Sequence, residues 1–216
     1  MVHHLSDRPG LHQTFLMQLR DAEYQKDRFL FRKNMEKLGQ ILAYEISQSL
    51  PVKEIQVKTP LGMAKALVPE KDPVLCCILR AGLPFYQGFQ DYFPASPAGF
   101  IGAYRGQARG DHSFEIELDY EAMPPMVGLP VIVIDPMLAS GKSMLKAARL
   151  VQQNGSPSAI ILASLIASPE GIAFLQKEIP EASIWTVAID QGLNEHAYIL
   201  PGLGDAGDLS FGIKAP

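Results

Sequence analysis

Four continuous apolar runs constrain the fold of this chain more than any other feature. They are Val74–Leu79, Val131–Ile134, Ala159–Ala167 and Ile184–Ile189. A strand with one face in water alternates apolar and polar residues, whereas a strand buried on both faces is apolar throughout. The runs therefore predict four buried, parallel strands.

The segments between these runs have the pattern of helices. Residues 143–154 carry apolar side chains at helical spacing and are followed by Gly155, a residue typical of helix ends. Ser168 and Pro169 are a typical capping residue and first residue of a second helix, which Pro180 ends. Strand and helix alternate, so we expect an α/β fold with a parallel sheet flanked by helices.

The regions before and after the first run follow other patterns. Apolar residues from Phe31 to Ile46 recur every three or four positions and predict an amphipathic helix of about twenty residues that packs on the sheet. Residues 114–120 alternate apolar and polar side chains, which predicts a hairpin arm at about residues 103–125. The glycine-rich segment from Gln191 onward predicts a long shaped loop rather than a regular element.

Composition and charge narrow the class of protein. The 216 residues are 47% hydrophobic and 19% charged, which is typical of a globular chain, and we expect a single domain over residues 1–216. The net charge of −4 does not favour nucleic acid or anionic lipid. The apolar runs are too short to span a bilayer, and MVHHLSDRPG has no signal-peptide pattern, so we expect the cytoplasm. Cys76 and Cys77 should point to opposite faces of one strand as small buried side chains.

Ligands of open α/β sheets bind beyond the carboxyl ends of the strands, so the loops that follow the runs are candidate sites. The first loop, Arg80-Ala81-Gly82, combines a guanidinium group with small residues whose amides could approach an anion. The alternative is an ordinary arginine at a sheet edge beside a glycine turn.

The second loop runs from Asp135 to Ser143 and opens a helix. Its exposed amides predict a phosphate cradle, and Asp135 could hold hydroxyls or a metal-bound ligand. A plain capped turn is the alternative. The GKS sequence at its end resembles a nucleotide-kinase phosphate loop, but that motif requires glycine five positions before Gly141, where this chain has Pro136.

The third loop, residues 190–208, is rich in glycine, and Tyr198 within it could cover the face of a flat ligand. The histidines do not form a metal-binding pattern. They are scattered at His3, His4, His12, His112 and His196.

Four segments together resemble uracil phosphoribosyltransferases. They are ILRAGL, the pair Tyr104-Arg105, IDPMLASGKS and AIDQGLNEHAYILPGLGDAGD, the last of which is long and unusual in composition. The resemblance implies a type I phosphoribosyltransferase fold, with a β-hairpin arm and a C-terminal hood loop at about residues 190–210. It also implies that uracil and 5-phosphoribosyl 1-diphosphate give UMP and diphosphate, with Mg²⁺ as cofactor.

The resemblance further implies roles for individual residues. Asp135 would lie against the ribose hydroxyls and, with Arg105, act in catalysis. The peptide after Arg80 would adopt a strained geometry that points its amide at diphosphate. The implied phosphoribosyl diphosphate site comprises Arg80, Arg105, Asp135, Pro136, Met137, Leu138, Ala139, Ser140, Gly141, Lys142, Ser143 and Asp205.

For the base, the resemblance implies Tyr198 against the face of uracil and the main chain of Ile199 and Gly204 at its edge, with Asp205 and Ala206 completing the site. Mg²⁺ would be held through the diphosphate, on the side of Asp205, with no side-chain site of its own. The family's members associate, which implies a homodimer or larger homo-oligomer, and GTP activates some of them.

The chain departs from the family pattern at Lys142, where glycine is usual, and at residues 106–109, where acidic residues are usual. No carboxylate stands out as a base for N1 of uracil. The alternatives are a UMP-sensing, RNA-binding regulator on the same fold, a phosphoribosyltransferase for another base, and a nucleoside kinase.

Overall fold

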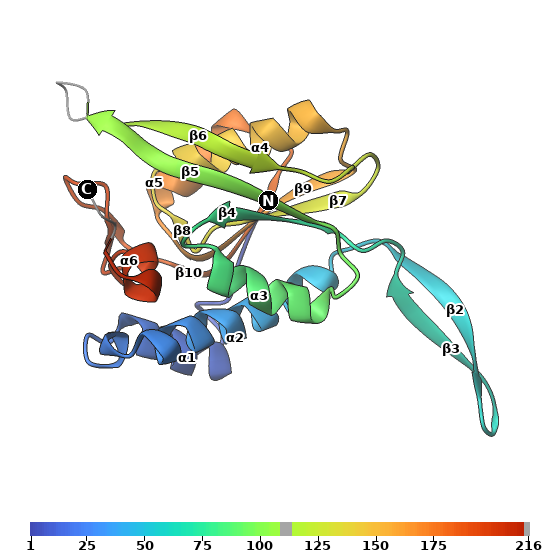
Figure 1. Cartoon of the computed structure of the whole chain (residues 1–216). Helices are drawn as coiled ribbons and strands as arrows, with labels where there is room; N and C mark the ends of the chain where they lie inside the picture. Colours follow the sequence, from blue (N-terminus) through green and yellow to red (C-terminus); the bar gives the residue numbers. More distant parts are fainter. Residues whose placement is uncertain (109–113, 214–216) are drawn as a thin grey trace.

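A twisted sheet of eight strands forms the centre of the molecule (Figure 1). The computed structural model describes the backbone of residues 1–108 and 114–213 and the side chains of residues 1–102 and 120–213. The strand order is β1 (Val2–His4), β10 (Ser183–Ile189), β9 (Ala159–Ala167), β7 (Pro130–Ile134), β4 (Val74–Leu79), β5 (Ala98–Ala108) and β6 (Phe114–Ala122), and β8 (Met137–Leu138) extends beside β9.

All neighbouring strands of this sheet are parallel except β5 and β6. The four apolar runs are β4, β7, β9 and β10, and their residues are almost all buried, as the sequence predicts. Strands buried on both faces need cover on both sides, and the helices supply it.

One face of the sheet is covered by α1 (Leu11–Arg20), α2 (Arg28–Ser47) and α3 (Leu83–Tyr92), and the other by α4 (Lys142–Asn154) and α5 (Pro169–Glu178) (Figure 1). The short helix η1 (Tyr24–Lys26) connects α1 to α2. The predicted N-terminal helix is confirmed as α2, which contacts β9 and β10. Cys77 belongs to the core under α2, and Cys76 belongs to the core under α4, so the two thiols do point to opposite faces.

Local sequence explains where the helices begin and end. The Asp27 carboxylate accepts the N–H groups of Phe29 and Leu30 and caps α2. The Ser168 hydroxyl accepts the N–H of Gly171 at the start of α5, and Gly155 follows α4. The two sequence-predicted helices between the runs are therefore confirmed together with their end signals.

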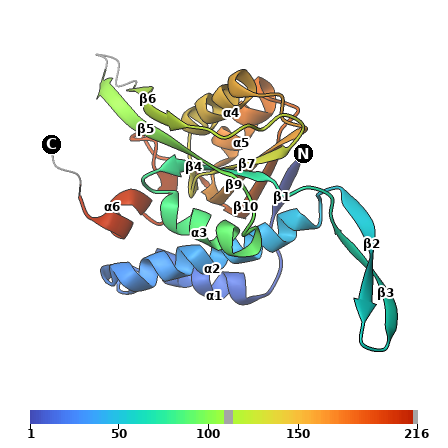
Figure 2. The same ribbon diagram turned by 45° about the vertical axis from the view of Figure 1, so that its right-hand side comes forward.

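Two hairpins extend from opposite ends of the body (Figures 1 and 2). Antiparallel pairing of β5 with β6 confirms the predicted arm, although its tip, residues 109–113, and the side chains of residues 103–119 lie outside the described part. The second hairpin, β2 (Val52–Thr59) with β3 (Gly62–Pro69), is not anticipated by the sequence analysis. Most of its side chains are exposed.

The expectation that the segment after Gln191 is a long shaped loop without regular elements is wrong. This segment contains the short strands β11 (Gly192–Leu193) and β12 (Ile199–Leu200), which pair antiparallel, and the helix α6 (Ala206–Phe211). These elements are too short to give a periodic pattern in the sequence. Asp205 starts α6 by accepting the N–H groups of Gly207 and Asp208.

The strand order reverses between β4 and β7, because the chain passes from β4 outward to β5 and β6 and then returns to the other side of β4. Ligands of open α/β sheets bind beyond the carboxyl ends of strands at such a reversal. The loops that follow β4 and β7 are thus neighbours at this point. Within the described residues, no helix is long and apolar enough to cross a membrane.

Candidate active site

The loop after β4 brings Arg80 under the C-terminal helix. One terminal nitrogen of its guanidinium, Nη2, donates to Asp208 Oδ1 at 2.8 Å and to the Gly212 carbonyl at 2.7 Å. The Nε atom is buried and has no hydrogen-bond partner among the described residues. The side chain is one-third exposed, so Arg80 is a partly accessible cation whose charge is balanced by Asp208.

The backbone at this loop differs from the expectation that places an unusual peptide after Arg80. A non-proline cis peptide lies one bond earlier, between Leu79 and Arg80. Gly82 is packed closely, because a Cβ atom there would lie 2.5 Å from the Ile78 carbonyl and 3.1 Å from the Ile134 carbonyl. The small residues thus allow the end of β4 to pack against the end of β7.

Asp135 stands at the end of β7, where its N–H donates to the Ala163 carbonyl at 3.1 Å. Among the described residues its carboxylate accepts only the N–H of Met137, at 3.3 Å. Burial disfavours the charged carboxylate and raises the pKa of Asp135 to about 7, while the bond from Met137 acts in the opposite direction. Burial thus makes the carboxyl group of Asp135 easier to protonate than that of an exposed aspartate.

We call residues 135–143 the phosphate loop, after the role that the sequence resemblance implies for them. It ends at α4, whose N-cap is Gly141 with φ of +77°, and no side chain among the described residues caps this helix. The Leu145 N–H donates to the Gly141 carbonyl at 2.9 Å, which is the hydrogen bond at the start of the helix. The preceding N–H groups of the first turn lack intrahelical partners, and the helix dipole adds positive character to them.

The phosphate loop rests on the start of α5. Ser168 Oγ donates to the Ala139 carbonyl at 2.7 Å, and a Cβ atom on Gly171 would lie 2.1 Å from that same oxygen. Pro136, Leu138 and Gly141 are buried, Met137, Ala139, Ser140 and Ser143 are half-buried, and Lys142 is exposed. The loop is held by its own strand, its own helix, the neighbouring strand β9 and the start of α5.

We call residues 190–206 the base segment, after the role that the sequence resemblance implies for them. Its strands are joined by a hydrogen bond of 2.9 Å from the Asn194 N–H to the Tyr198 carbonyl, and Asn194 Oδ1 accepts the N–H groups of His196 and Tyr198. Bonded and non-bonded residue pairs alternate along an antiparallel pair, so Leu193 and Ile199 form the non-bonded pair. The Leu193 N–H donates to Glu170 Oε1 instead, at 3.2 Å.

The peptide groups of Ile199 consequently point away from β11, although its side chain is buried. Tyr198 is 40% exposed, and Gly204, with φ of +91°, is exposed. Ala206 is buried in the same core as Ile199. The exposed Asp205 uses Oδ1 to cap α6, which leaves Oδ2 outside these two bonds.

The structure brings two of the sequence-predicted groups into contact. A Cβ atom on Gly207 would lie 3.7 Å from Ala81 Cβ and 3.8 Å from Arg80 Nε, so α6 sits on the loop after β4. Asp208 completes this contact, although no feature of the sequence points to it. The Arg105 side chain lies outside the described residues, and the backbone places Arg105 in β5 opposite Ile116.

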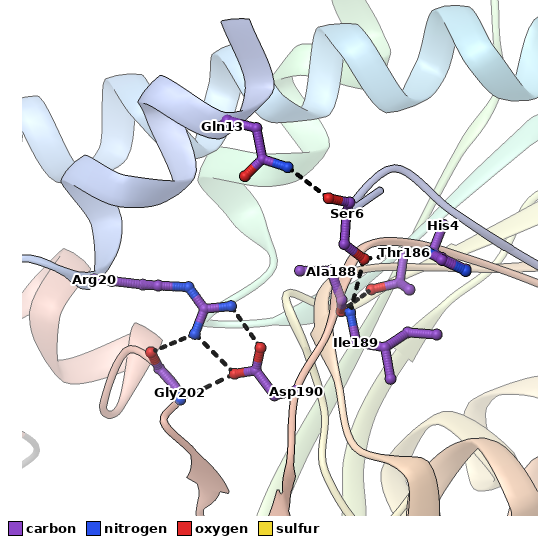
Figure 3. Close-up of polar contacts among 9 residues, drawn as sticks. All are labelled: His4, Ser6, Gln13, Arg20, Thr186, Ala188, Ile189, Asp190 and Gly202. Atoms are coloured by element: carbon purple, nitrogen blue, oxygen red, sulfur yellow. Dashed lines mark hydrogen bonds and ion pairs between the residues drawn. The ribbon is translucent and has the colours of Figure 1, made fainter. Parts of the chain in front are cut away.

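The sequence also gives no sign of a second network, which joins Asp190 to Gly202 in the base segment (Figure 3). Arg20 of α1 donates to both carboxylate oxygens of Asp190, at 2.9 and 2.5 Å, and to the Gly202 carbonyl at 3.1 Å. The Gly202 N–H donates to Asp190 Oδ2 at 2.9 Å. No sequence pattern links residues so far apart, which is why Arg20 gave no signal.

The acidic side chains near the site decide how a metal ion could be held. No cluster of three or more histidine, cysteine, aspartate or glutamate side chains exists within the described residues. Mg²⁺ commonly binds through one or two carboxylates together with substrate phosphates rather than in an all-protein cage. The exposed carboxylate of Asp205 fits that mode.

The sequence matches the family model described as "Uracil phosphoribosyltransferase" over residues 7–213. The chain belongs to the uracil phosphoribosyltransferase family. A member from Porphyromonas gingivalis is 42% identical over 214 residues, covering 99% of both chains. A member from Thermococcus gammatolerans is 37% identical over 220 residues, covering 100% of this chain and 96% of its own.

Solved structures support the fold. A protein from Aquifex aeolicus is 29% identical, covers 100% of both chains and superposes with a TM-score of 0.87. Adenine phosphoribosyltransferase from Leishmania donovani is 11% identical, covers 91% of this chain and 86% of its own, and gives a TM-score of 0.57. The fold is therefore that of the type I phosphoribosyltransferases, as the resemblance in the sequence implies.

Proposed function

We infer that this protein is an enzyme that transfers the phosphoribosyl group of 5-phosphoribosyl 1-diphosphate to uracil, giving UMP and diphosphate in pyrimidine salvage. The observation that carries the inference is the match to uracil phosphoribosyltransferases over residues 7–213, which include all three loops at the carboxyl edge of the sheet.

On the sugar side, we assign the 5′-phosphate to the phosphate loop and the ribose hydroxyls to Asp135. The uncapped first turn of α4 supports the first assignment, because N–H groups at a helix start bind anions. The pKa of about 7 supports the assignment of the ribose hydroxyls to Asp135. Burial keeps water away from this carboxyl group, and hydrogen bonds donated by ribose hydroxyls would stabilise its charged form. Arg80 and Arg105 would bind the diphosphate.

On the base side, Tyr198 would cover one face of uracil, while the main chain of Ile199 and Gly204 reads its edge beside Ala206. The outward peptide groups of Ile199 support this assignment. Uracil offers acceptor, donor and acceptor groups at O2, N3 and O4. Cytosine lacks that order, so fixed main-chain groups would leave it with unpaired polar atoms.

The reaction asks for positioning and charge stabilisation more than for side-chain nucleophiles. As the bond from C1′ of the ribose to the diphosphate breaks, Arg80 and Arg105 would balance charge on the leaving group, and Asp135 would hold the sugar. Mg²⁺, bound with the substrate's phosphates beside Asp205, would neutralise part of that charge.

We also propose that the enzyme works in the cytoplasm as a homodimer or larger assembly, and that GTP is an effector. Exposed apolar side chains of the β2–β3 hairpin support self-association, since Leu61 is 100% exposed and Leu67 70% exposed. The apolar face of α2 is not available for it, because that face is buried in the core.

One experiment tests the function. The protein is incubated with Mg²⁺, 5-phosphoribosyl 1-diphosphate and, separately, uracil, cytosine, hypoxanthine or orotate, and the nucleotide is identified by mass. We expect UMP alone. IMP or OMP in place of UMP would overturn the choice of base. If no nucleotide is made, separate assays distinguish the alternatives: binding of RNA by the protein would favour a regulator, and consumption of ATP with uridine would favour a kinase.

A further inference from the structure

We propose that Arg20, on α1, is a positioning residue that sets the geometry of the base segment and thereby the affinity for uracil. The proposal rests on the inferred uracil phosphoribosyltransferase activity and assigns to that site a residue 170 positions away in sequence.

The first argument is geometric. Asp190 opens the base segment, and Gly202 lies twelve residues later. The Asp190 carboxylate accepts the Gly202 N–H, and Arg20 donates to both the Asp190 carboxylate and the Gly202 carbonyl, as Figure 3 shows. These contacts hold Asp190 and Gly202 together as the neck of the base segment. Tyr198 and Ile199, two of the groups assigned to uracil, lie between these residues, and Gly204 and Ala206 follow Gly202.

The second argument concerns charge. The Asp190 side chain is 3% exposed, so its carboxylate is removed from water. A buried charge is strongly unfavourable without a partner, and the two-pronged contact with a guanidinium fixes both distance and orientation. Without Arg20 the carboxylate would need water or another cation, and the neck would have to open to admit either.

The third argument is that both anchors of the neck are themselves fixed. The Asp190 N–H donates to the Ala167 carbonyl at 2.8 Å, which ties it to β9. On α1, Gln13 Nε2 donates to the Ser6 carbonyl at 2.8 Å, and Ser6 Oγ accepts the Ile189 N–H at 3.4 Å. Arg20 therefore reaches the neck from a helix that is attached to the same end of β10.

Gly202 shows how little freedom the neck has. Its φ is +65°, and a Cβ atom there would lie 2.1 Å from the Ile199 carbonyl. A displacement at Gly202 is therefore transmitted directly to Ile199. The edge of uracil would be read by main-chain groups of Ile199, so a shift of the neck changes base binding before it changes phosphate binding.

The test is the kinetics of Arg20→Gln with each substrate varied in turn. We expect the KM for uracil to rise roughly 10- to 100-fold, since misplacement of a binding group by about 1 Å costs up to that much, while the KM for 5-phosphoribosyl 1-diphosphate changes less than about twofold. Arg20→Lys restores one donor and should recover part of the loss. The matched control is Arg8→Gln, which removes the exposed ion pair with Glu45 and should leave both KM values unchanged.

If Arg20→Gln folds poorly, the double variant with Arg20→Gln and Asp190→Asn takes its place, because it leaves no unpaired buried charge. Its uracil KM should rise no further than that of whichever single variant, Arg20→Gln or Asp190→Asn, folds better. Equal changes in both KM values that follow thermal stability, or an unchanged uracil KM, would overturn the proposal. Absence of UMP synthesis by the unaltered enzyme would instead overturn the inferred function.

Discussion

The phosphate loop and the base segment lie at the same edge of the sheet, yet they are held in different ways. The phosphate loop is built by β7, the short strand β8 and α4, and its outside support comes from the neighbouring strand β9 and from Ser168 and Gly171 at the start of α5. The base segment depends on remote residues. Arg20 closes its neck, Gln25 Nε2 donates to the Leu203 carbonyl at 2.7 Å, and Glu170 accepts the Leu193 N–H.

The difference teaches how the two substrates can be recognised separately. A phosphate needs N–H groups in one tight turn, which a strand followed by a helix supplies locally. A planar base needs a face and an edge at defined positions, which a segment without long regular elements provides only when other parts of the fold hold it. Changes in the phosphate loop should affect phosphoribosyl diphosphate and turnover, and changes around the base segment should affect uracil.

The largest expected effect comes from Asp135→Asn in the phosphate loop. Loss of the carboxylate beside the ribose should lower kcat on the order of 100-fold, the effect of removing a group that stabilises charge in the transition state. Steady-state kinetics measure it. An unchanged kcat with a raised KM for uracil would contradict the separation of the two regions.

The same variant should be more stable than the native chain at neutral pH. The folded-state pKa of Asp135, about 7, exceeds its ordinary value of 3.8. The folded state therefore loses stability as pH rises from 3.8 to about 7, because the unfolded chain ionises first. Removing the charge should raise the free energy of unfolding by about 1–3 kcal/mol near pH 8 and by almost nothing near pH 4. Urea unfolding at the two pH values tests this sign.

Tyr198→Ala changes the base segment without touching its neck. Loss of the ring against uracil should raise the uracil KM, by an amount that corresponds to about 1–3 kcal/mol of lost binding free energy, as for base stacking in nucleic-acid complexes. The KM for 5-phosphoribosyl 1-diphosphate should stay constant. Tyr198→Phe, which keeps the ring, is the matched control and should bind uracil almost normally.

Lys142→Gly probes the departure of the phosphate loop from the family pattern. Lys142 is exposed at the start of α4, where a cation opposes the helix dipole unless an anion is bound. We expect 5-phosphoribosyl 1-diphosphate to bind more weakly by about 1.5 kcal/mol, with a smaller loss at high salt. A KM that does not change at any ionic strength would place the ammonium group in solvent.

The smallest effect should come from Glu170→Gln, which weakens the contact between α5 and the base segment. Backbone N–H groups of Glu170 itself and of Leu193 lower the pKa of this carboxylate below its usual 4.5. Its contribution is present at neutral pH and is lost as pH falls through the lowered pKa. We expect a uracil KM raised less than about threefold, because the neutral amide still accepts the Leu193 N–H. A larger effect than that of Arg20→Gln would shift the main anchor from α1 to α5.

The sequence predicted the strand and the helix on either side of the phosphate loop well because the signals for them are local. Continuous apolar runs specify strands buried on both faces, and Gly141 and Gly155 bound the helix that follows Asp135. The sequence missed the β2–β3 hairpin, whose side chains are mostly exposed and follow no burial pattern. It also missed α6, since six residues are too few to show a helical period.

The amino-acid sequence by itself determined the four buried parallel strands, the helices α2, α4 and α5, the loop that follows β7 and the family resemblance in the base segment. Burial of strands, caps and glycine turns depend on residues close in the chain. Only the tertiary structure decided that Arg80 pairs with Asp208 and that Arg20 pairs with Asp190, 170 positions along the chain. Ion pairs of this kind form between side chains that meet after the sheet and helices have packed, so no local pattern records them.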